Sequence, residues 1–165
     1  MKLASEAQIT AALESHGEHA SIFRFPNVVG APATHGVIFD FIHKLRANPA
    51  RLDVLGDGTQ QKAYLHVSDL VEAMLFIAQQ RAEKVAIVNI GPSDAGVTVK
   101  TIAESVRNAV SPDAQIVYGQ GNKGWVGDVP RFRYATTRLA DMGWKPRLNS
   151  AQAVQQAIAD IVETL

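Results

Sequence analysis

The chain has 165 residues, of which 47% are hydrophobic and 19% charged, a composition typical of a soluble globular domain with a substantial core. Its 16 basic and 16 acidic side chains balance, which argues against a nucleic-acid partner, and no apolar run approaches the ~20 residues that cross a bilayer. The lack of cysteine excludes disulfides and cysteine–zinc sites and fits a reducing cytoplasm, and the N-terminus lacks the apolar core of a signal peptide.

Hydrophobic spacing predicts that strands and helices alternate along the chain, which favours an α/β fold with parallel strand pairing. Strands are predicted over residues 21–25, 52–55, 63–67, 85–90 and 115–118. Helices are predicted over residues 3–15, from 37 to the Asn48-Pro49 stop, from Ser68-Asp69, from Thr98 to Ser111-Pro112, over 137–142, and from Ser150 to the end.

Apolar residues at helical spacing mark the helix faces that are expected to contact the core. Thr98 and Ser150 are expected to cap their helices. The expected stripes are Leu3, Ala7 and Leu13; Val37, Ile38, Phe41, Ile42 and Leu45; Val71, Met74, Leu75 and Ala78; Val99, Ile102, Ala103 and Val106; and Val154, Ile158, Ile161, Val162 and Leu165.

The segment from Leu52 to Asp69 is the most informative part of the chain. It predicts a short strand, a glycine turn, a second strand carrying Lys62 and Tyr64, and then a helix. Taken alone, this spacing favours a hairpin with a solvated lysine. A lysine just beyond a glycine turn can also meet a phosphate, and Tyr64 would face the same side of the strand.

The order of motifs resembles that of the extended short-chain dehydrogenases, the NAD-dependent nucleotide-sugar epimerases and dehydratases. Gly56-Asp57-Gly58, followed by a basic residue, an aromatic residue and His66-Val67-Ser68-Asp69, matches their substrate-domain signature. Four further segments fit in the same order, so the resemblance covers nearly the whole chain. They are Arg24–Gly30, Asn89–Gly91 with Val97–Val99, Gly127–Pro130, and Leu139–Pro146.

Two features of that family are missing from the sequence: the glycine-rich dinucleotide fingerprint and the tyrosine of the catalytic Tyr-x-x-x-Lys. Lys2 to Glu6 is similar to the Lys-x-x-x-Glu that follows this tyrosine. The resemblance therefore implies the C-terminal half of an enzyme, cut inside its active-site helix, with Lys2 as the lysine that lowers the tyrosine's pKa and holds the NAD ribose. By itself, Lys2 is equally an exposed terminal lysine.

For the domain organisation, the resemblance implies a single truncated unit over residues 1–165. Residues 1–30 and 68–91 would be remnants of the dinucleotide-binding sheet, and residues 31–67 and 92–165 would form the nucleotide-sugar domain. The strands near Ser21 and Val85 would then be the last two of a seven-stranded parallel sheet. We expect their uncovered edge to be buried by a homodimer, by strand exchange or by refolding at the N-terminus, unless the missing N-terminal half covers it as a partner.

The resemblance also implies a set of ligand contacts along the chain. Those for the nicotinamide are Phe25 and Pro26, and those for the sugar and diphosphate are Asn27, Gly36, Val37 and Lys62, with Tyr64 beside them. Lys62 stands where most members have an arginine, so it keeps the charge but loses the bidentate fork. Taken alone, Asn27 also suits an Asx turn, and Tyr64 suits the core.

The nucleoside end of the ligand is implied by two other segments. The backbone near Asp53 and Leu55 would pair with a uracil or thymine base, and Asp128 would bind the ribose hydroxyls. Many epimerases have an arginine where this chain has Trp125, and Lys123 could supply the lost charge. Asp128 alone is equally a turn aspartate, and the five histidines show no metal-ligand spacing.

Within the family the resemblance is greatest to the UDP-glucose 4-epimerases. It implies an intact enzyme in which hydride passes from sugar C4 to NAD, a 4-keto sugar forms, and hydride returns to the other face. We expect residues 1–165 alone to be inactive and to bind a UDP-sugar. The alternatives are a noncatalytic remnant or interaction module, or part of a 4,6-dehydratase or a decarboxylase.

Overall fold

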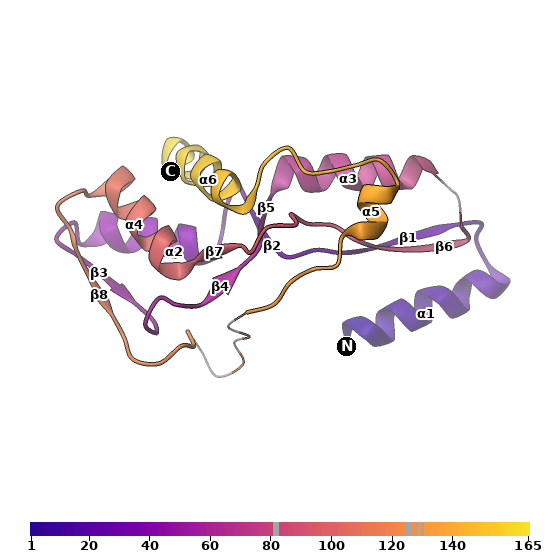
Figure 1. Ribbon diagram of the computed structural model, residues 1–165, viewed down its shortest axis with the longest axis horizontal. Coiled ribbons are helices and arrows are strands. Elements are labelled where there is room, and N and C mark those ends of the chain that lie inside the picture. Colours follow the sequence, from indigo (N-terminus) through magenta and orange to yellow (C-terminus); the bar gives the residue numbers. More distant parts are fainter. Residues whose placement is uncertain (81–82, 125–126, 128, 130) are drawn as a thin grey trace.

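The computed structural model describes residues 1–80, 83–124, 127, 129 and 131–165. In this part of the chain, helices and strands alternate and form an elongated α/β molecule (Figure 1). The helices are α1 (Lys2–Ser15), α2 (Val37–Ala47), α3 (Val67–Gln80), α4 (Val99–Val110), α5 (Thr137–Asp141) and α6 (Ser150–Thr164). The strands are β1 (Ala20–Arg24), β2 (Asn27–Val29), β3 (Arg51–Val54), β4 (Gln61–Lys62), β5 (Tyr64–His66), β6 (Val85–Asn89), β7 (Val97–Thr98) and β8 (Gln115–Tyr118).

Parallel pairing dominates the described strands, which confirms the α/β expectation. β1 pairs with β6, β2 with β5 and β3 with β8, all in parallel, whereas β4 and β7 are antiparallel. Parallel partners require long crossover connections, and the helices supply them. In Figure 1, α1 and α3 flank the β1–β6 pair at one end of the long axis, while α2 and α4 lie over β3 and β8 at the other.

The hairpin interpretation of residues 52–67 is wrong. β3 pairs with β8, β4 with β7, and β5 with β2, so no two strands of this segment pair with each other. The segment therefore crosses between three strand pairs, and the glycine turn redirects the chain instead of closing a hairpin. The partners come from distant parts of the sequence, which local spacing cannot reveal.

Two hydrophobic clusters form the core of the described residues. The first joins α2, β3, α4 and α6, and its fully buried members include Ile42, Leu45, Leu52 and Ile102. The second lies around β5, α3, β6 and α5, and includes Leu65, Ile77, Val88, Ile90, Leu139 and Trp144. The expected stripes of α2 and α4 are confirmed, since Ile38, Phe41, Ile42, Leu45, Ile102, Ala103 and Val106 are buried.

Three details of the helices differ from the sequence-based expectations. α3 buries Leu70, Ala73 and Ile77, whereas Val71 and Leu75 are exposed, so the predicted face was rotated by about one residue. Of the α1 residues only Leu13 is buried, and Leu165 at the end of the chain is exposed.

The cap of α6 is also one residue earlier than expected. Asn149 is the N-cap and forms a reciprocal capping box with Gln152, whereas Ser150 is buried as the first helical residue. The Ser150 hydroxyl instead accepts a hydrogen bond from the Tyr64 backbone N–H at 3.1 Å. The predicted cap at Thr98 is confirmed, because its hydroxyl accepts a hydrogen bond from the Thr101 N–H.

A buried carboxylate ties the chain before α6 to α3. Asp69 is fully buried, and its two oxygens accept hydrogen bonds from Arg147 Nε at 3.0 Å and from the Leu148 N–H at 3.1 Å. Arg147 also pairs with Glu72, which is half exposed. Because Asp69 satisfies a backbone donor as well as a cation, it anchors this connection more firmly than Glu72 does.

We expect Asp69→Ala to lower the free energy of unfolding by about 2 kcal/mol, because the Leu148 N–H loses its charged acceptor. Glu72→Ala removes the other carboxylate from Arg147 and serves as the control, with an expected loss below about 1 kcal/mol. Urea denaturation of both variants measures the difference. Equal losses would show that the buried hydrogen bonds add nothing beyond a surface ion pair.

Candidate functional site

A cavity of about 860 Å³ lies where β1 leads into β2, and it continues along the N-terminal part of α2 to the turn after β3. Its wall contains eight of the thirteen residues that the sequence predicts for a site. They are Phe25, Pro26, Asn27, Gly36, Val37, Leu55, Lys62 and Tyr64. In α/β folds ligands bind beyond the carboxyl ends of parallel strands, and Phe25, Pro26 and Leu55 stand at such ends.

The first wall is the segment between β1 and α2. Asn27 pairs in register with Tyr64 across the β2–β5 ladder, and Gly30 packs so closely on the first residue of α3 that a Cβ there would lie 2.7 Å from Val67 Cγ1. Tyr134 donates a hydrogen bond from its hydroxyl to the Phe25 carbonyl at 3.0 Å. No sequence pattern indicates that contact, since 109 positions separate the two residues.

The N-terminus of α2 opens toward the cavity. Gly36 is the N-cap with φ of 104°, and no atom lies within 4 Å of the place where its Cβ would be. A glycine cap gives no side-chain acceptor, so the first N–H groups of α2 remain available to an anion. The backbone conformation is one that L side chains rarely adopt, which explains the glycine.

Lys62 and Tyr64 hold the opposite wall. Lys62 belongs to β4, which pairs with Val97 of β7, and β7 comes close because Gly96 has no side chain. Tyr64 is 4% exposed, so it lines the cavity from within the core, and both of its expected roles are compatible with that position.

The glycine turn after β3 encloses a side chain that the sequence analysis missed. Gln60 is 2% exposed and its Nε2 donates to the Leu55 carbonyl at 3.4 Å. A Cβ on Gly56 would lie 2.2 Å from that Nε2, so the glycine leaves room for the amide. In the same turn, hydrogen bonds from the Thr59 hydroxyl and N–H lower the pKa of Asp57.

Lys44 is a second residue that the sequence analysis did not single out. It lies on the cavity wall, its Nζ is 2.8 Å from Asp40 Oδ2, and it donates to the Asp53 carbonyl at 3.4 Å. A helical wheel places it on the same face of α2 as Val37 and Phe41. That this face meets β3 becomes visible only in the fold.

Other predicted residues lie off the cavity wall. The Asp53 carboxylate is exposed and pairs with Arg51 at 2.7 Å, which lowers the pKa of Asp53 through the side-chain hydrogen bonds. Lys123 is exposed, although the next residue, Gly124, does line the cavity. Trp125 and Asp128 lie outside the described residues.

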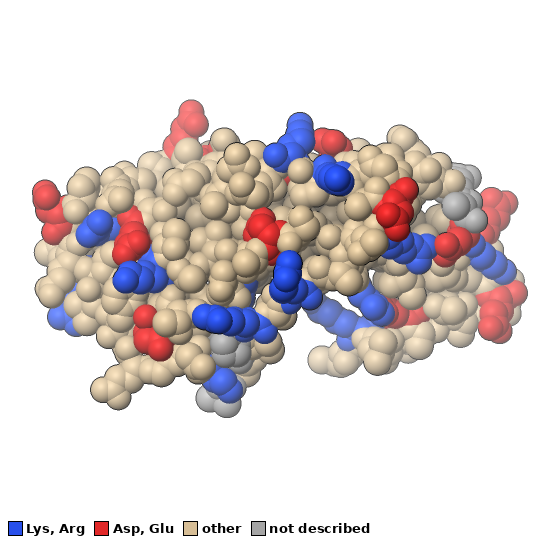
Figure 2. Space-filling view, viewed as in Figure 1, with Lys and Arg blue, Asp and Glu red and all other residues tan. Residues whose placement is uncertain are grey.

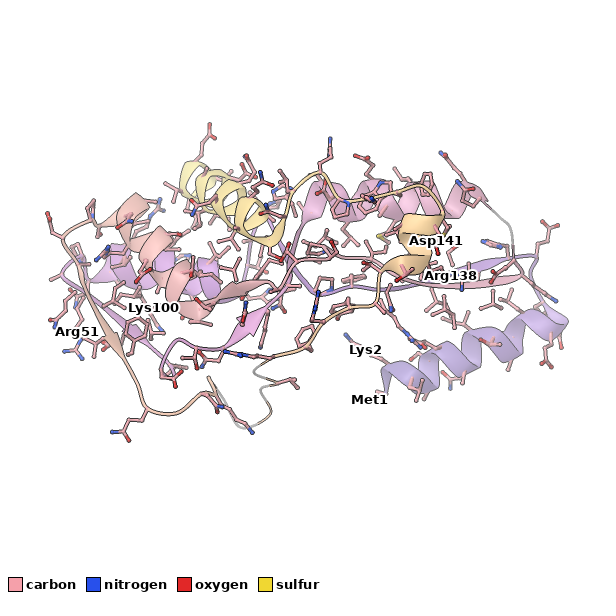
Figure 3. The ribbon with its side chains drawn as sticks, in the orientation of Figure 1. Met1, Lys2, Arg51, Lys100, Arg138 and Asp141 are labelled. Carbon is pink, nitrogen blue, oxygen red and sulfur yellow. The ribbon has the colours of Figure 1, made fainter. Side chains whose placement is uncertain are left out.

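Lys2 is exposed at the N-terminal end of α1 (Figure 3). α1 is joined to β1 by an ion pair between Glu6 and Arg24, in which Arg24 Nε donates to Glu6 Oε1 at 2.9 Å. Figure 2 shows Lys and Arg side chains gathered beside the hollow between α1 and the rest of the molecule. Among the described residues no group of three or more His, Asp or Glu could hold a metal ion. The helices of this part of the chain are also too short or too polar to span a bilayer.

Comparison with known proteins identifies the family. The model of the NAD dependent epimerase/dehydratase family matches residues 1–91, and the chain belongs to that family. The fold agrees: a crystal structure of UDP-galactose 4-epimerase superposes with a TM-score of 0.84 and 34% identity, over 99% of this chain and 52% of that one. The structure of MoeE5 in complex with UDP-glucuronic acid and NAD has a TM-score of 0.81 and 25% identity, over 99% of this chain and 55% of that one.

A curated relative has a different name. The protein named "Probable GDP-L-fucose synthase 1" from Oryza sativa subsp. japonica is 28% identical over 124 residues, which cover 74% of this chain and 36% of that protein. The chain therefore spans about half of the similar structures and about a third of this relative. The names include both UDP-sugar and GDP-sugar enzymes, so they do not indicate which nucleotide base this cavity would bind.

Proposed function

We propose that residues 1–165 form the nucleotide-sugar-binding portion of an NAD-dependent sugar epimerase or dehydratase, with UDP-glucose 4-epimerase-like chemistry at sugar C4. One observation carries the proposal. The cavity brings together a lysine, an uncapped helix N-terminus and a strand end with a buried amide beside it, and these come from four separate segments. Such a combination suits a ligand with an anionic centre and a flat polar end.

The diphosphate would be held from two sides. Lys62 supplies a positive charge, and the first N–H groups of α2, beyond Gly36, supply donors aligned with the helix dipole. Lysine acts as a point charge where an arginine would act as a fork, so the Lys62 contact tolerates more variation in the diphosphate conformation. The cavity volume of about 860 Å³ is within the range of cofactor and ligand sites.

The sugar and the nicotinamide would meet near Phe25 and Pro26, where β1 ends. Phe25 is 42% exposed, which is unusual for an aromatic residue at the end of a core strand and suits an apolar wall for a ring. Asn27 follows with one donor and one acceptor group for sugar hydroxyls. NAD, when bound, supplies hydride transfer at sugar C4. These three side chains would orient the sugar, and Lys2 would act at the cofactor's ribose.

We expect Lys62→Ala to weaken UDP-glucose binding by about tenfold or more, because a charged contact to the diphosphate is lost. Calorimetric titration of UDP-glucose, UDP and dTDP into the purified chain measures it. Lys100→Ala is the control: Lys100 is exposed on the neighbouring α4 and does not line the cavity.

Binding that Lys62→Ala leaves unchanged would contradict the diphosphate assignment. The absence of any nucleotide binding by the original chain would contradict the proposed function. Epimerisation of UDP-galactose by residues 1–165 with added NAD would contradict the expectation that they bind without turnover.

A further inference from the structure

One edge of β3 faces away from its partner strand. The Ala50 carbonyl accepts from the Gln115 N–H at 2.9 Å, and the Val54 carbonyl accepts from the Gly119 N–H at 3.0 Å. Because backbone groups alternate along a strand, the N–H and C=O groups of Asp53 point to the opposite edge. Leu55 follows β3, and the peptide that joins it to Val54 is planar and trans, so the Leu55 N–H points away from the Val54 carbonyl, toward that same edge. No other described strand pairs with that edge.

Side chains confirm this direction. The Asp53 carbonyl accepts from Lys44 Nζ, and the Leu55 carbonyl accepts from Gln60 Nε2, each at 3.4 Å. Both donors and Leu55 line the cavity, whereas Asp53 lies off its wall and is joined to it through the contact of its carbonyl with Lys44. The edge therefore presents the Asp53 carbonyl and the Leu55 N–H side by side, with the Lys44 ammonium next to the carbonyl.

The Lys44 ammonium is held in place but retains donor capacity. Asp40 Oδ2 lies 2.8 Å from Nζ and keeps the side chain against α2, where the ammonium is also 5.9 Å from the centre of the Phe41 ring. An ammonium has three N–H donors, and the contacts with Asp40 and Asp53 use two of them. The Lys44 side chain is 37% exposed, so a ligand in the cavity can reach the third.

The edge thus offers a donor, an acceptor and a donor in sequence: Lys44 Nζ, the Asp53 carbonyl and the Leu55 N–H. The imide edge of uracil or thymine presents the complementary order of carbonyl, N–H and carbonyl. Guanine presents carbonyl, N–H and amino group, so its amino group would meet a donor at one end. Cytosine and adenine place an unprotonated ring nitrogen opposite the Asp53 carbonyl, which sets acceptor against acceptor.

We propose that Lys44 is a specificity-determining residue for the base. The Leu55 N–H would bind one imide carbonyl of uracil or thymine, and Lys44 would bind the other and so exclude guanosine and cytidine nucleotides. The inference rests on the proposed function, because that function places a nucleotide in this cavity. The inference goes beyond the proposed function because it assigns the choice of base to a side chain on α2. The relatives' names do not make that choice, since they include both UDP-sugar and GDP-sugar enzymes.

The test compares four nucleotides, UDP, dTDP, GDP and CDP, by calorimetric titration into the original chain and three variants. The original chain is expected to bind UDP and dTDP about tenfold more tightly than GDP or CDP. Lys44→Met keeps the apolar stem and removes the ammonium. The Lys44→Met variant should bind UDP and dTDP about tenfold more weakly than the original chain does, and CDP less than about threefold more weakly. Lys44→Arg should restore most of the preference, and Lys100→Met, the same change on α4, should leave all four affinities unchanged.

Three results would overturn the proposal. If Lys44→Met weakens the binding of all four nucleotides equally, Lys44 acts as a general cation for the diphosphate and does not select the base. Tighter binding of GDP than of UDP by the original chain would refute the base assignment and leave the nucleotide-sugar function standing. A lack of binding by every nucleotide would refute both, and circular dichroism of each variant separates these outcomes from a loss of folding.

Discussion

Gly96→Ala is expected to lower the free energy of unfolding by about 3 kcal/mol. A Cβ at Gly96 would lie 2.2 Å from the Lys62 carbonyl oxygen and 2.7 Å from the Ala63 nitrogen. These are backbone atoms, so no side-chain rotation can relieve the overlap, which costs about 1–3 kcal/mol. The φ of 84° adds about 1–2 kcal/mol for any residue with a side chain.

The same substitution is expected to impair ligand binding, because it displaces β4, which carries Lys62. Gly121→Ala is the matched control: Gly121 has φ of 77°, but no atom lies within 4 Å of its Cβ position. Gly121→Ala should lower the free energy of unfolding by only about 1 kcal/mol, the cost of the positive φ for a residue with a side chain. Guanidinium denaturation measures both variants, and equal losses would show that β7 and β4 are not in such close contact.

Leu45→Ala is expected to lower the free energy of unfolding by about 3–4 kcal/mol. Leu45 has no exposed surface and lies in the cluster that joins α2 to β3, α4 and α6. Truncation removes buried methyl groups and leaves a cavity between elements that cannot close fully, which together typically cost about 2–5 kcal/mol.

Leu75→Ala is the matched control, because it makes the same change on α3 at a side chain that is 61% exposed. Its expected cost is within about 0.5 kcal/mol. Thermal and chemical denaturation of both variants provide the comparison. A loss at Leu75 as large as that at Leu45 would show that the outer face of α3 is covered in solution, and would restore the stripe that the sequence suggested.

The buried face of α3 was predicted wrongly for a definite physical reason. Its sequence carries apolar residues on almost every face, since Leu70, Val71, Met74, Leu75 and Ile77 alternate closely with Ala73 and Ala78. Periodicity alone then gives several equivalent stripes. The structure selects one because the buried Asp69 must face Arg147 and the Leu148 N–H, which fixes the rotation of the helix.

The hairpin error has a different origin. The turn residues Gly56, Asp57 and Gly58 suit a reversal of the chain, and the local pattern cannot distinguish a reversal from a crossing between strand pairs. The partners β8, β7 and β2 come from residues 115–118, 97–98 and 27–29, so the choice depends on contacts far along the chain. The order of the motifs along the chain was more informative than the local pattern of this one segment, because the family match confirmed the resemblance that the order predicted.

From the sequence alone we could predict the alternation of helices and strands, the cap at Thr98, the start of α2 at Gly36, and the family, because these depend on local chemistry and on the order of motifs. It also marked Lys62, Asn27 and Leu55, which line one cavity. The three-dimensional fold was needed to show that Lys44 and Gln60 lie on the same cavity wall. Both act on carbonyls at the unpaired edge of β3, and which edge of a strand stays unpaired is set by its partner, here β8, more than 60 positions away.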